Sequence, residues 1–111
     1  MPEFLYIYRG TQRPSDPQEG QQILQKWMSW LEGLAKQGKL KDRGQPLEPT
    51  GKVVNGRAKT VTDGPYAEAK DLVGGFSLVE ARDLDEAVEL SKGCPALERG
   101  GTVEVRPLMK I

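Results

Sequence analysis

Residues 4–8 of the chain, Phe-Leu-Tyr-Ile-Tyr, form a run of β-favouring residues that is apolar at both odd and even positions. Successive side chains of a strand point to opposite faces, so a strand with this sequence has two hydrophobic faces. Such a strand is normally central in its sheet and covered on both sides. The run therefore constrains the whole fold, because both faces of its sheet have to be buried.

Two helices are predicted around this strand. The first opens at Ser15-Asp16-Pro17, where a capping residue precedes a proline suited to the first helical position, and it ends at Gly38. Its apolar residues fall within an arc of about 160°; they are Ile23, Leu24, Trp27, Met28, Trp30, Leu31, Leu34 and Ala35. At this spacing the two tryptophans are typical of core packing. The second helix opens at Asp83, ends at Gly93-Cys94-Pro95, and has the predicted inner face Leu84, Ala87, Val88 and Ser91.

The remaining segments predict further strands and turns. Residues 40–47 suit a weak edge strand, and residues 52–61 suit a hairpin with the two-residue Asn55-Gly56 turn. A short helical turn is expected over 66–72, and strands over 73–81 and 102–106. The order is that of the α+β class, a ferredoxin-like βαββαβ fold with an inserted β-hairpin, in one domain over residues 1–111.

This fold leaves one face of the sheet unaccounted for. Two helices cover a single face, whereas the first strand is apolar on both. A second copy of the same sheet would bury the other face. We therefore predict a C2 homodimer packed sheet to sheet.

Composition excludes several function classes. The chain has 16 basic and 16 acidic residues, no histidine and one cysteine. Zero net charge argues against a nucleic-acid partner, and although residues 36–59 are basic and residues 60–98 acidic, no aromatic platform lies between Trp30 and Tyr66. No apolar run approaches the roughly 20 residues that span a bilayer, and no signal peptide is apparent, so we expect no membrane partner and a cytoplasmic location.

The same composition limits cofactor chemistry. The single Cys94 excludes an internal disulfide and a cage of cysteines alone, and without histidine the commonest metal ligand and general base is missing. We expect no metal and no organic cofactor. Cys94 itself, at a helix C-terminus, is predicted to be an unreactive packed thiol with a raised pKa.

The segment from Thr62 to Lys70 is where a site is expected, because it joins a sharp turn, three charged side chains and an aromatic ring between a hairpin and a buried strand. Asp63 is the candidate general acid or base, since burial in a pocket would raise its pKa toward neutrality. The alternative is that Asp63 only accepts backbone hydrogen bonds at its turn.

Further residues are candidates for binding an unknown small molecule. They are Tyr6, Tyr8, Tyr66, Glu68, Lys70 and Arg106. Arg106 would hold an anionic group, but Glu104 lies on the same strand face, so the two could equally form a surface pair. Glu68 and Lys70 could likewise be exposed charges alone.

The stretch Thr62-Asp63-Gly64-Pro65-Tyr66-Ala67-Glu68-Ala69-Lys70, followed by Gly74-Gly75-Phe76, resembles the signature of YCII-related proteins of the DGPF-domain type. The likeness extends to residues 83–87, 100–101 and 103–107. The resemblance implies a bacterial protein with a ferredoxin-like fold that forms a dimeric α+β barrel. It also implies a His–Asp site, of which only the aspartate has a counterpart here, at Asp63. Tyr66 stands where phenylalanine is usual. Because some members occur beside or fused to sigma factors, the resemblance allows a transcription-related partner.

Three functions stay open at this stage. The protein is a small-molecule enzyme that uses Asp63, a non-catalytic ligand-binding or regulatory module, or a structural dimer in which the Asp63 turn only builds the fold.

Overall fold

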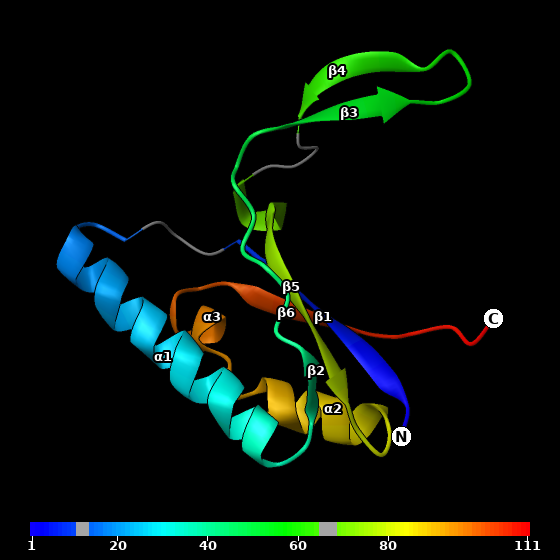
Figure 1. The fold of residues 1–111 in the computed structure, drawn as a ribbon. Helices are drawn as coiled ribbons and strands as arrows, with labels where there is room; N and C mark the ends of the chain where they lie inside the picture. The colour runs from blue at the N-terminus through cyan, green and yellow to red at the C-terminus, as the bar shows by residue number, and fades with distance from the viewer. Residues whose placement is uncertain (11–13, 65–68) are drawn as a thin grey trace.

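The computed structural model describes residues 1–10, 14–64 and 69–111 (Figure 1). The elements in chain order are β1 (Glu3–Arg9), α1 (Pro17–Lys36), β2 (Leu40–Asp42), β3 (Gly51–Asn55), β4 (Thr60–Gly64), the 3-10 helix η1 (Ala69–Asp71), β5 (Val73–Glu80), α2 (Leu84–Ser91), α3 (Pro95–Glu98) and β6 (Thr102–Pro107). Four strands form one antiparallel sheet in the order β2-β5-β1-β6, and β3 pairs with β4 in a separate sheet. This confirms the ferredoxin-like α+β fold with an inserted hairpin.

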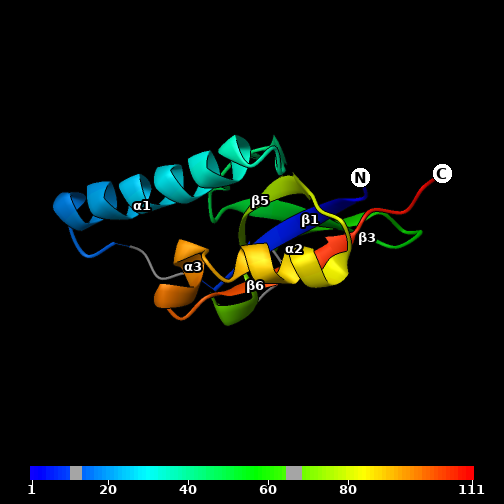
Figure 2. The same ribbon diagram turned by 90° about the horizontal axis from the view of Figure 1, so that it is seen from below.

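Strand β1 lies at the centre of the sheet, between β5 and β6, as its sequence predicts. Phe4, Tyr6 and Tyr8 point to one face and are buried, whereas Leu5 and Ile7 point to the other and are half-buried. Tyr6 stacks on Trp30 of α1, with ring centroids 6.0 Å apart, and its hydroxyl donates to a carbonyl oxygen of α2. Both long helices therefore cover the same face, the arrangement visible in Figures 1 and 2.

Helix α1 begins and ends where the sequence predicts. The Asp16 carboxylate accepts the backbone N–H of Glu19 at 2.7 Å, and Gly38, with φ of 71°, follows the last turn. Its buried stripe is narrower than predicted, however. Leu31 and Leu34 are buried, but Leu24 and Met28 remain exposed, because they overhang a pocket at the edge of the sheet instead of packing on it.

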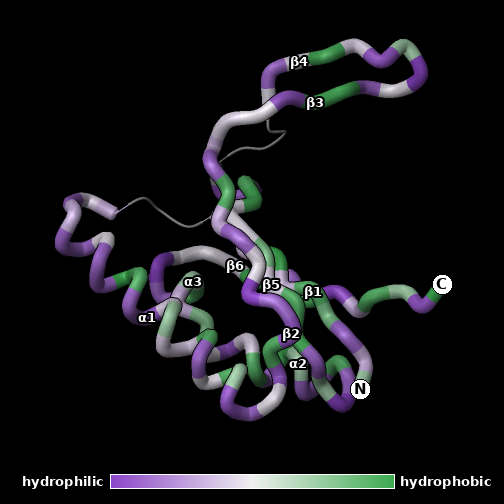
Figure 3. Tube along the Cα trace, in the orientation of Figure 1, coloured by the Kyte–Doolittle hydropathy of each residue, from purple (hydrophilic) through white to green (hydrophobic). Residues whose placement is uncertain are grey.

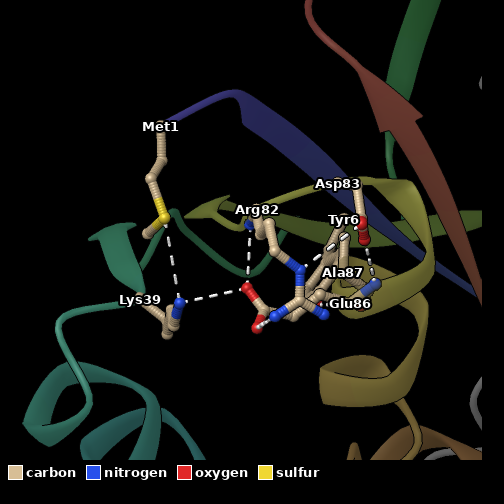
Figure 4. A network of polar contacts seen from close by, with 7 residues as sticks. All are labelled: Met1, Tyr6, Lys39, Arg82, Asp83, Glu86 and Ala87. Carbon is tan, nitrogen blue, oxygen red and sulfur yellow. Dashed lines mark hydrogen bonds and ion pairs between the residues drawn. The ribbon is translucent and has the colours of Figure 1, made fainter.

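Helix α2 is anchored by a polar network at its N-terminus (Figure 4). The Asp83 carboxylate accepts the Glu86 N–H at 2.8 Å, which confirms the predicted cap. The Glu86 carboxylate in turn accepts the backbone N–H of Arg82 at 2.8 Å and the Lys39 ammonium at 3.0 Å. The network therefore joins the end of β5 and the start of β2 to the first turn of α2.

The predicted inner face of α2 is wrong in part. Ala87 and Ser91 are buried, but Leu84 and Val88 are exposed. The Tyr6 hydroxyl donates to the carbonyl oxygen of Ala87, so this short side chain lies over the sheet. The stripe that faces the sheet then runs through Ala87 and Ser91, with Leu90 packed against the core, and leaves Leu84 and Val88 at its margin.

The hairpin is present, but its turn differs from the prediction. Asn55 pairs with Thr60, so residues 56–59 form a four-residue loop in place of the two-residue turn. Gly56 and Lys59 both adopt positive φ, at 53° and 56°. The Asn55 side chain donates to the carbonyl oxygen of Thr60 at 3.0 Å and thereby ties the two ends of the loop together.

The hairpin projects away from the rest of the protein (Figures 1 and 3). Val54 and Val61 oppose one another across its two strands and are 65% and 61% exposed. Figure 3 shows this hydrophobic stretch on the projecting arm. A two-stranded sheet is marginal in water on its own, and this arm presents an apolar surface that the described part of its protomer leaves exposed.

None of the helices in the described ranges is both long enough and apolar enough to span a membrane.

Candidate functional site

A pocket of about 430 Å³ opens between α1 and the β2–β5 edge of the sheet. Its lining comes from α1, the end of β1, the first half of β5 and the segment after β2. The lining residues are Tyr8, Leu24, Trp27, Met28, Leu31, Arg43, Gly44, Gln45, Pro46, Gly74, Gly75, Phe76 and Ser77. A concave, largely apolar pocket with a few polar groups is the usual form of a small-molecule site.

The outer wall of the pocket is the segment after β2, which glycines hold against β5. The Asp42 carboxylate accepts the Gly44 N–H at 2.8 Å and turns the chain. Gly44 has φ of 71°, and a Cβ there would lie 1.7 Å from the Phe76 carbonyl oxygen, so no larger residue fits. A bridge from Pro46 to Gly75 continues the contact. The predicted strand over 40–47 is therefore wrong beyond Asp42, because the chain bends there to form this wall.

The floor of the pocket is a chain of hydroxyl hydrogen bonds. The Tyr8 hydroxyl donates to Ser77 Oγ at 2.8 Å, and the Ser77 hydroxyl donates to the Arg43 carbonyl oxygen at 2.7 Å. Burial raises the pKa of Tyr8 well above its usual range, so the phenol stays protonated at neutral pH. Both hydroxyl protons are thus committed to bonds that fix the floor and the outer wall together.

Aromatic rings form the inner wall. Trp27 meets Tyr8 edge to face, with centroids 4.7 Å apart, and Trp30 lies behind them in the core. The predicted packing role holds for Trp30, whereas Trp27 also lines the pocket. Exposed Leu24 and Met28 border the mouth, so this side of the pocket is an apolar surface that suits a flat ring.

Arg43 is the one charged side chain among the described lining residues. Its Nη2 donates to the Met28 sulfur at 3.0 Å, across the mouth from the outer wall to α1. The described lining includes neither a carboxylate nor a histidine. The described lining therefore offers groups that could bind and orient a ligand, but no carboxylate or imidazole that could act as a general base.

Of the tyrosines predicted to bind a ligand, Tyr8 lines the pocket and Tyr6 lies beside it in the core. Tyr6 is fully buried under α2, and burial raises its pKa. Tyr66 and Glu68 lie outside the described residues.

The charged residues predicted from the sequence lie elsewhere. Lys70 is exposed in η1. Arg106 is exposed on β6, with Nη1 3.4 Å from a Glu104 carboxylate oxygen, and Glu104 also pairs with Arg9 at 3.1 Å. This is the surface pair that the sequence left open as an alternative.

Asp63 lies near the end of β4, on the projecting hairpin. Its side chain is 91% exposed, pairs with Lys52 on the neighbouring strand, and is absent from the lining of the pocket. The carboxylate is therefore exposed in its own protomer, and its role in catalysis stays a prediction.

Cys94 is buried, and burial raises the pKa of its thiol to about 12. It lies not simply at a helix C-terminus, as predicted, but at the N-cap of the short α3, which follows α2 directly. Among the residues that the structure describes, no group of three or more histidine, cysteine or acidic side chains is placed to hold a metal ion.

The sequence reasoning missed this pocket because its residues come from four separate segments. A signal was nevertheless present. Two glycines mark positions where two backbones approach closely, namely Gly44, two residues after Asp42, and Gly75 on β5. The exposed Leu24 and Met28 extend the apolar arc of α1 beyond what the sheet needs.

Three comparisons place the chain among known proteins. The family model of the YCII-related domain matches residues 4–111. Uncharacterized protein R00369 from Rhizobium meliloti (strain 1021) is 43% identical over 49 residues, which are 43% of this chain and 40% of that relative's length. The fold is similar to that of 5-chloro-2-hydroxyhydroquinone dehydrochlorinase (TftG) from Burkholderia phenoliruptrix AC1100, solved in complex with 2,5-dihydroxybenzoquinone. That likeness has a TM-score of 0.53 and 22% identity, and it covers 97% of this chain and 95% of the other.

Proposed function

The chain belongs to the YCII-related family, and on that premise we propose that it is a homodimeric small-molecule enzyme whose ligand binds in the pocket between α1 and β5. The observation that carries this proposal is the aromatic pocket itself. Trp27 and Tyr8 present ring surfaces next to exposed Leu24 and Met28. The related fold of TftG holds a flat six-membered ring compound, which supports a ligand of similar shape here.

The open face of the sheet supports the homodimer. The register places Leu5 opposite Leu78, and Ile7 opposite Phe76, on the face away from the helices. Lys41, Glu3 and Glu80 form a charged group at one end of this apolar strip. Along its β6 side, Arg106 lies opposite Leu5 and Glu104 opposite Ile7, and Glu104 also pairs with Arg9. A strip with mixed charges at its margins suits a self-complementary interface. The proposed occupant is therefore a second copy of the same sheet.

In this dimer we assign Asp63 the role of general acid or base. Asp63 shares one hairpin face with Val54 and Val61, because the pairs 52–63 and 54–61 alternate on the same side. An exposed apolar patch on a projecting arm suits packing against a second molecule. Packing would remove water from around the carboxylate at a cleft near the dimer interface, where it could transfer a proton to or from a ligand.

A non-catalytic ligand-binding module is the second candidate, and one observation favours it. The described lining of the pocket contains no carboxylate, and the protons of Tyr8 and Ser77 are already committed. A module of this kind would report ligand binding to a partner, and the family resemblance suggests a transcription-related one.

Calorimetric titration with flat ring compounds, 2,5-dihydroxybenzoquinone among them, tests the pocket. We expect saturable binding that weakens by about fivefold in Trp27→Leu, because an aromatic contact contributes about 1 kcal/mol. Leu108→Ala, an exposed change outside the pocket, is the matched control. Equal affinity of wild type and Trp27→Leu would mean that the ligand does not bind in this pocket. Turnover of a bound compound that disappears in Asp63→Asn would favour the enzyme, and binding without turnover would favour the module.

A further inference from the structure

We propose that the ligand of this pocket is an aromatic carboxylic acid, with its ring beside Trp27 and its carboxylate paired with Arg43. The inference rests on the proposed function, because it assigns a chemical class to the ligand of the same pocket. It depends on a separate observation, which is that the guanidinium of Arg43, at the mouth of the pocket, pairs with no described carboxylate.

Arg43 differs from most arginines of the described chain in its partners. Four described arginines pair with carboxylates, namely Arg9, Arg82, Arg99 and Arg106. No described carboxylate lies within ion-pair distance of Arg43, whose guanidinium donates to the Met28 thioether instead. A thioether sulfur is a weak, uncharged acceptor. Most of the hydrogen-bonding capacity of this guanidinium therefore remains for a ligand.

The position of Arg43 is fixed by its backbone. Its carbonyl oxygen accepts the Ser77 hydroxyl at 2.7 Å, and the next residue, Gly44, is held against β5 at the Phe76 carbonyl. The Cα of Arg43 is thus attached to the floor of the pocket, although its side chain reaches solvent. Because the backbone of Arg43 is held in place, no mobile loop has to become ordered when a ligand binds to its guanidinium. This lowers the entropic cost of binding.

The hydroxyl groups and the one charged side chain of the described lining favour an anion over a neutral ligand. Tyr8 donates to Ser77, and Ser77 donates to the outer wall, so neither hydroxyl proton is available to a ligand. Arg43 brings several N–H donors in a planar fork that matches a carboxylate in bidentate geometry. The described lining holds no acidic side chain that would repel an anion. Beside apolar rings this pairing is stronger than in open water.

Matched acid and amide pairs test the proposal by calorimetric titration near neutral pH. The probes are benzoate with benzamide, 2-naphthoate with 2-naphthamide, and biphenyl-4-carboxylate with its amide. Each pair keeps the ring and changes the charge, and the three pairs cover increasing length. The proteins are wild type, Arg43→Met and Arg57→Met. Arg57 belongs to the hairpin loop and not to the lining of the pocket, so it controls for the general loss of one positive charge.

We expect wild type and Arg57→Met to bind at least one acid about tenfold more tightly than its amide, which corresponds to about 1.4 kcal/mol. In Arg43→Met the preference should disappear while the amide binds as before. Equal affinity of acid and amide in wild type, or a preference that survives in Arg43→Met, would overturn the carboxylate assignment and leave the pocket as a binding site. If no acid and no amide binds, the proposed function fails, and this inference fails with it.

Discussion

The two faces of the four-stranded sheet are formed by alternate residues of the same strands, yet the helices that the structure describes cover only one of the two faces. On the helix face, Phe4, Tyr6 and Val79 are each at most 3% exposed, and no buried side-chain polar atom in the described part of the chain lacks a hydrogen-bond partner. On the opposite face, Leu5 and Ile7 remain half-buried, and Phe76 is exposed. The difference shows that an apolar strand pattern predicts burial without specifying what provides it.

The largest expected loss of stability comes from removing a large buried side chain from the helix-covered face of the sheet. Tyr6→Ala should reduce the free energy of unfolding by about 3–5 kcal/mol, because it leaves a cavity between β1 and both helices. Leu5→Ala, the neighbouring residue on the open face, should cost less than about 2 kcal/mol in a protomer that lacks a partner. Urea denaturation at low protein concentration measures both. Equal losses would mean that the two faces do not differ in the protomer.

The next effect concerns the open face. Ile7→Glu places a charge in the middle of the apolar strip and should weaken self-association by about a hundredfold or more, which corresponds to about 2.7 kcal/mol. Light scattering over a concentration series measures the association. Gln25→Glu, an exposed change on α1, adds the same charge outside the strip and should leave association unchanged. A dimer that tolerates Ile7→Glu would mean that the second copy binds elsewhere.

A smaller expected effect is a loss of stability at low pH, which tests the polar network at the start of α2. The Arg82 N–H lowers the pKa of Glu86 below 4.5, and the Glu86 N–H lowers the pKa of Asp83 below 3.8. Stability from these groups is fully present above their ordinary values and is lost as the pH falls through the lowered values. The wild-type free energy of unfolding should therefore decrease below about pH 4.5.

Glu86→Gln tests this assignment, because it removes one of the two titrating groups. Its stability should be lower at neutral pH and should change less between pH 5 and pH 3. Glu32→Gln, an exposed change on α1, is the control. An acid profile identical in Glu86→Gln and wild type would assign the pH dependence to other carboxylates.

Local sequence signals predicted the fold well. Asp16 and Asp83 cap their helices as expected, because a cap needs only residues within three positions of each other. The central place of β1 followed from its composition alone. What failed depended on contacts between distant segments. The turn after Asp42 exists because Gly44 lies against β5, and the exposure of Leu84 follows from how α2 sits over Tyr6.

The candidate site could be predicted only in part for the same reason. Tyr8 was singled out and does line the pocket, but Trp27, Arg43 and Gly75 come to it from three other segments. No local pattern links these residues. The sequence drew attention instead to the segment around Asp63, where one short stretch holds several reactive side chains, and the protomer leaves that aspartate exposed.

The smallest expected effect on stability therefore comes from Asp63→Asn, which extends the comparison to the uncovered hairpin. The carboxylate is exposed and pairs only with Lys52 among the contacts found for it in the described chain. Exposed ion pairs contribute about 0–1 kcal/mol, so the unfolding free energy of a monomeric protomer should change by less than about 0.5 kcal/mol. Lys52→Met removes the same ion pair from the other side and is the matched control.

If Asp63 acts at a cleft formed with a second copy, Asp63→Asn should abolish turnover while Lys52→Met retains it. Strong destabilisation of the protomer by Asp63→Asn would contradict this expectation. It would mean that the Asp63 carboxylate stabilises the fold and that its main role is structural.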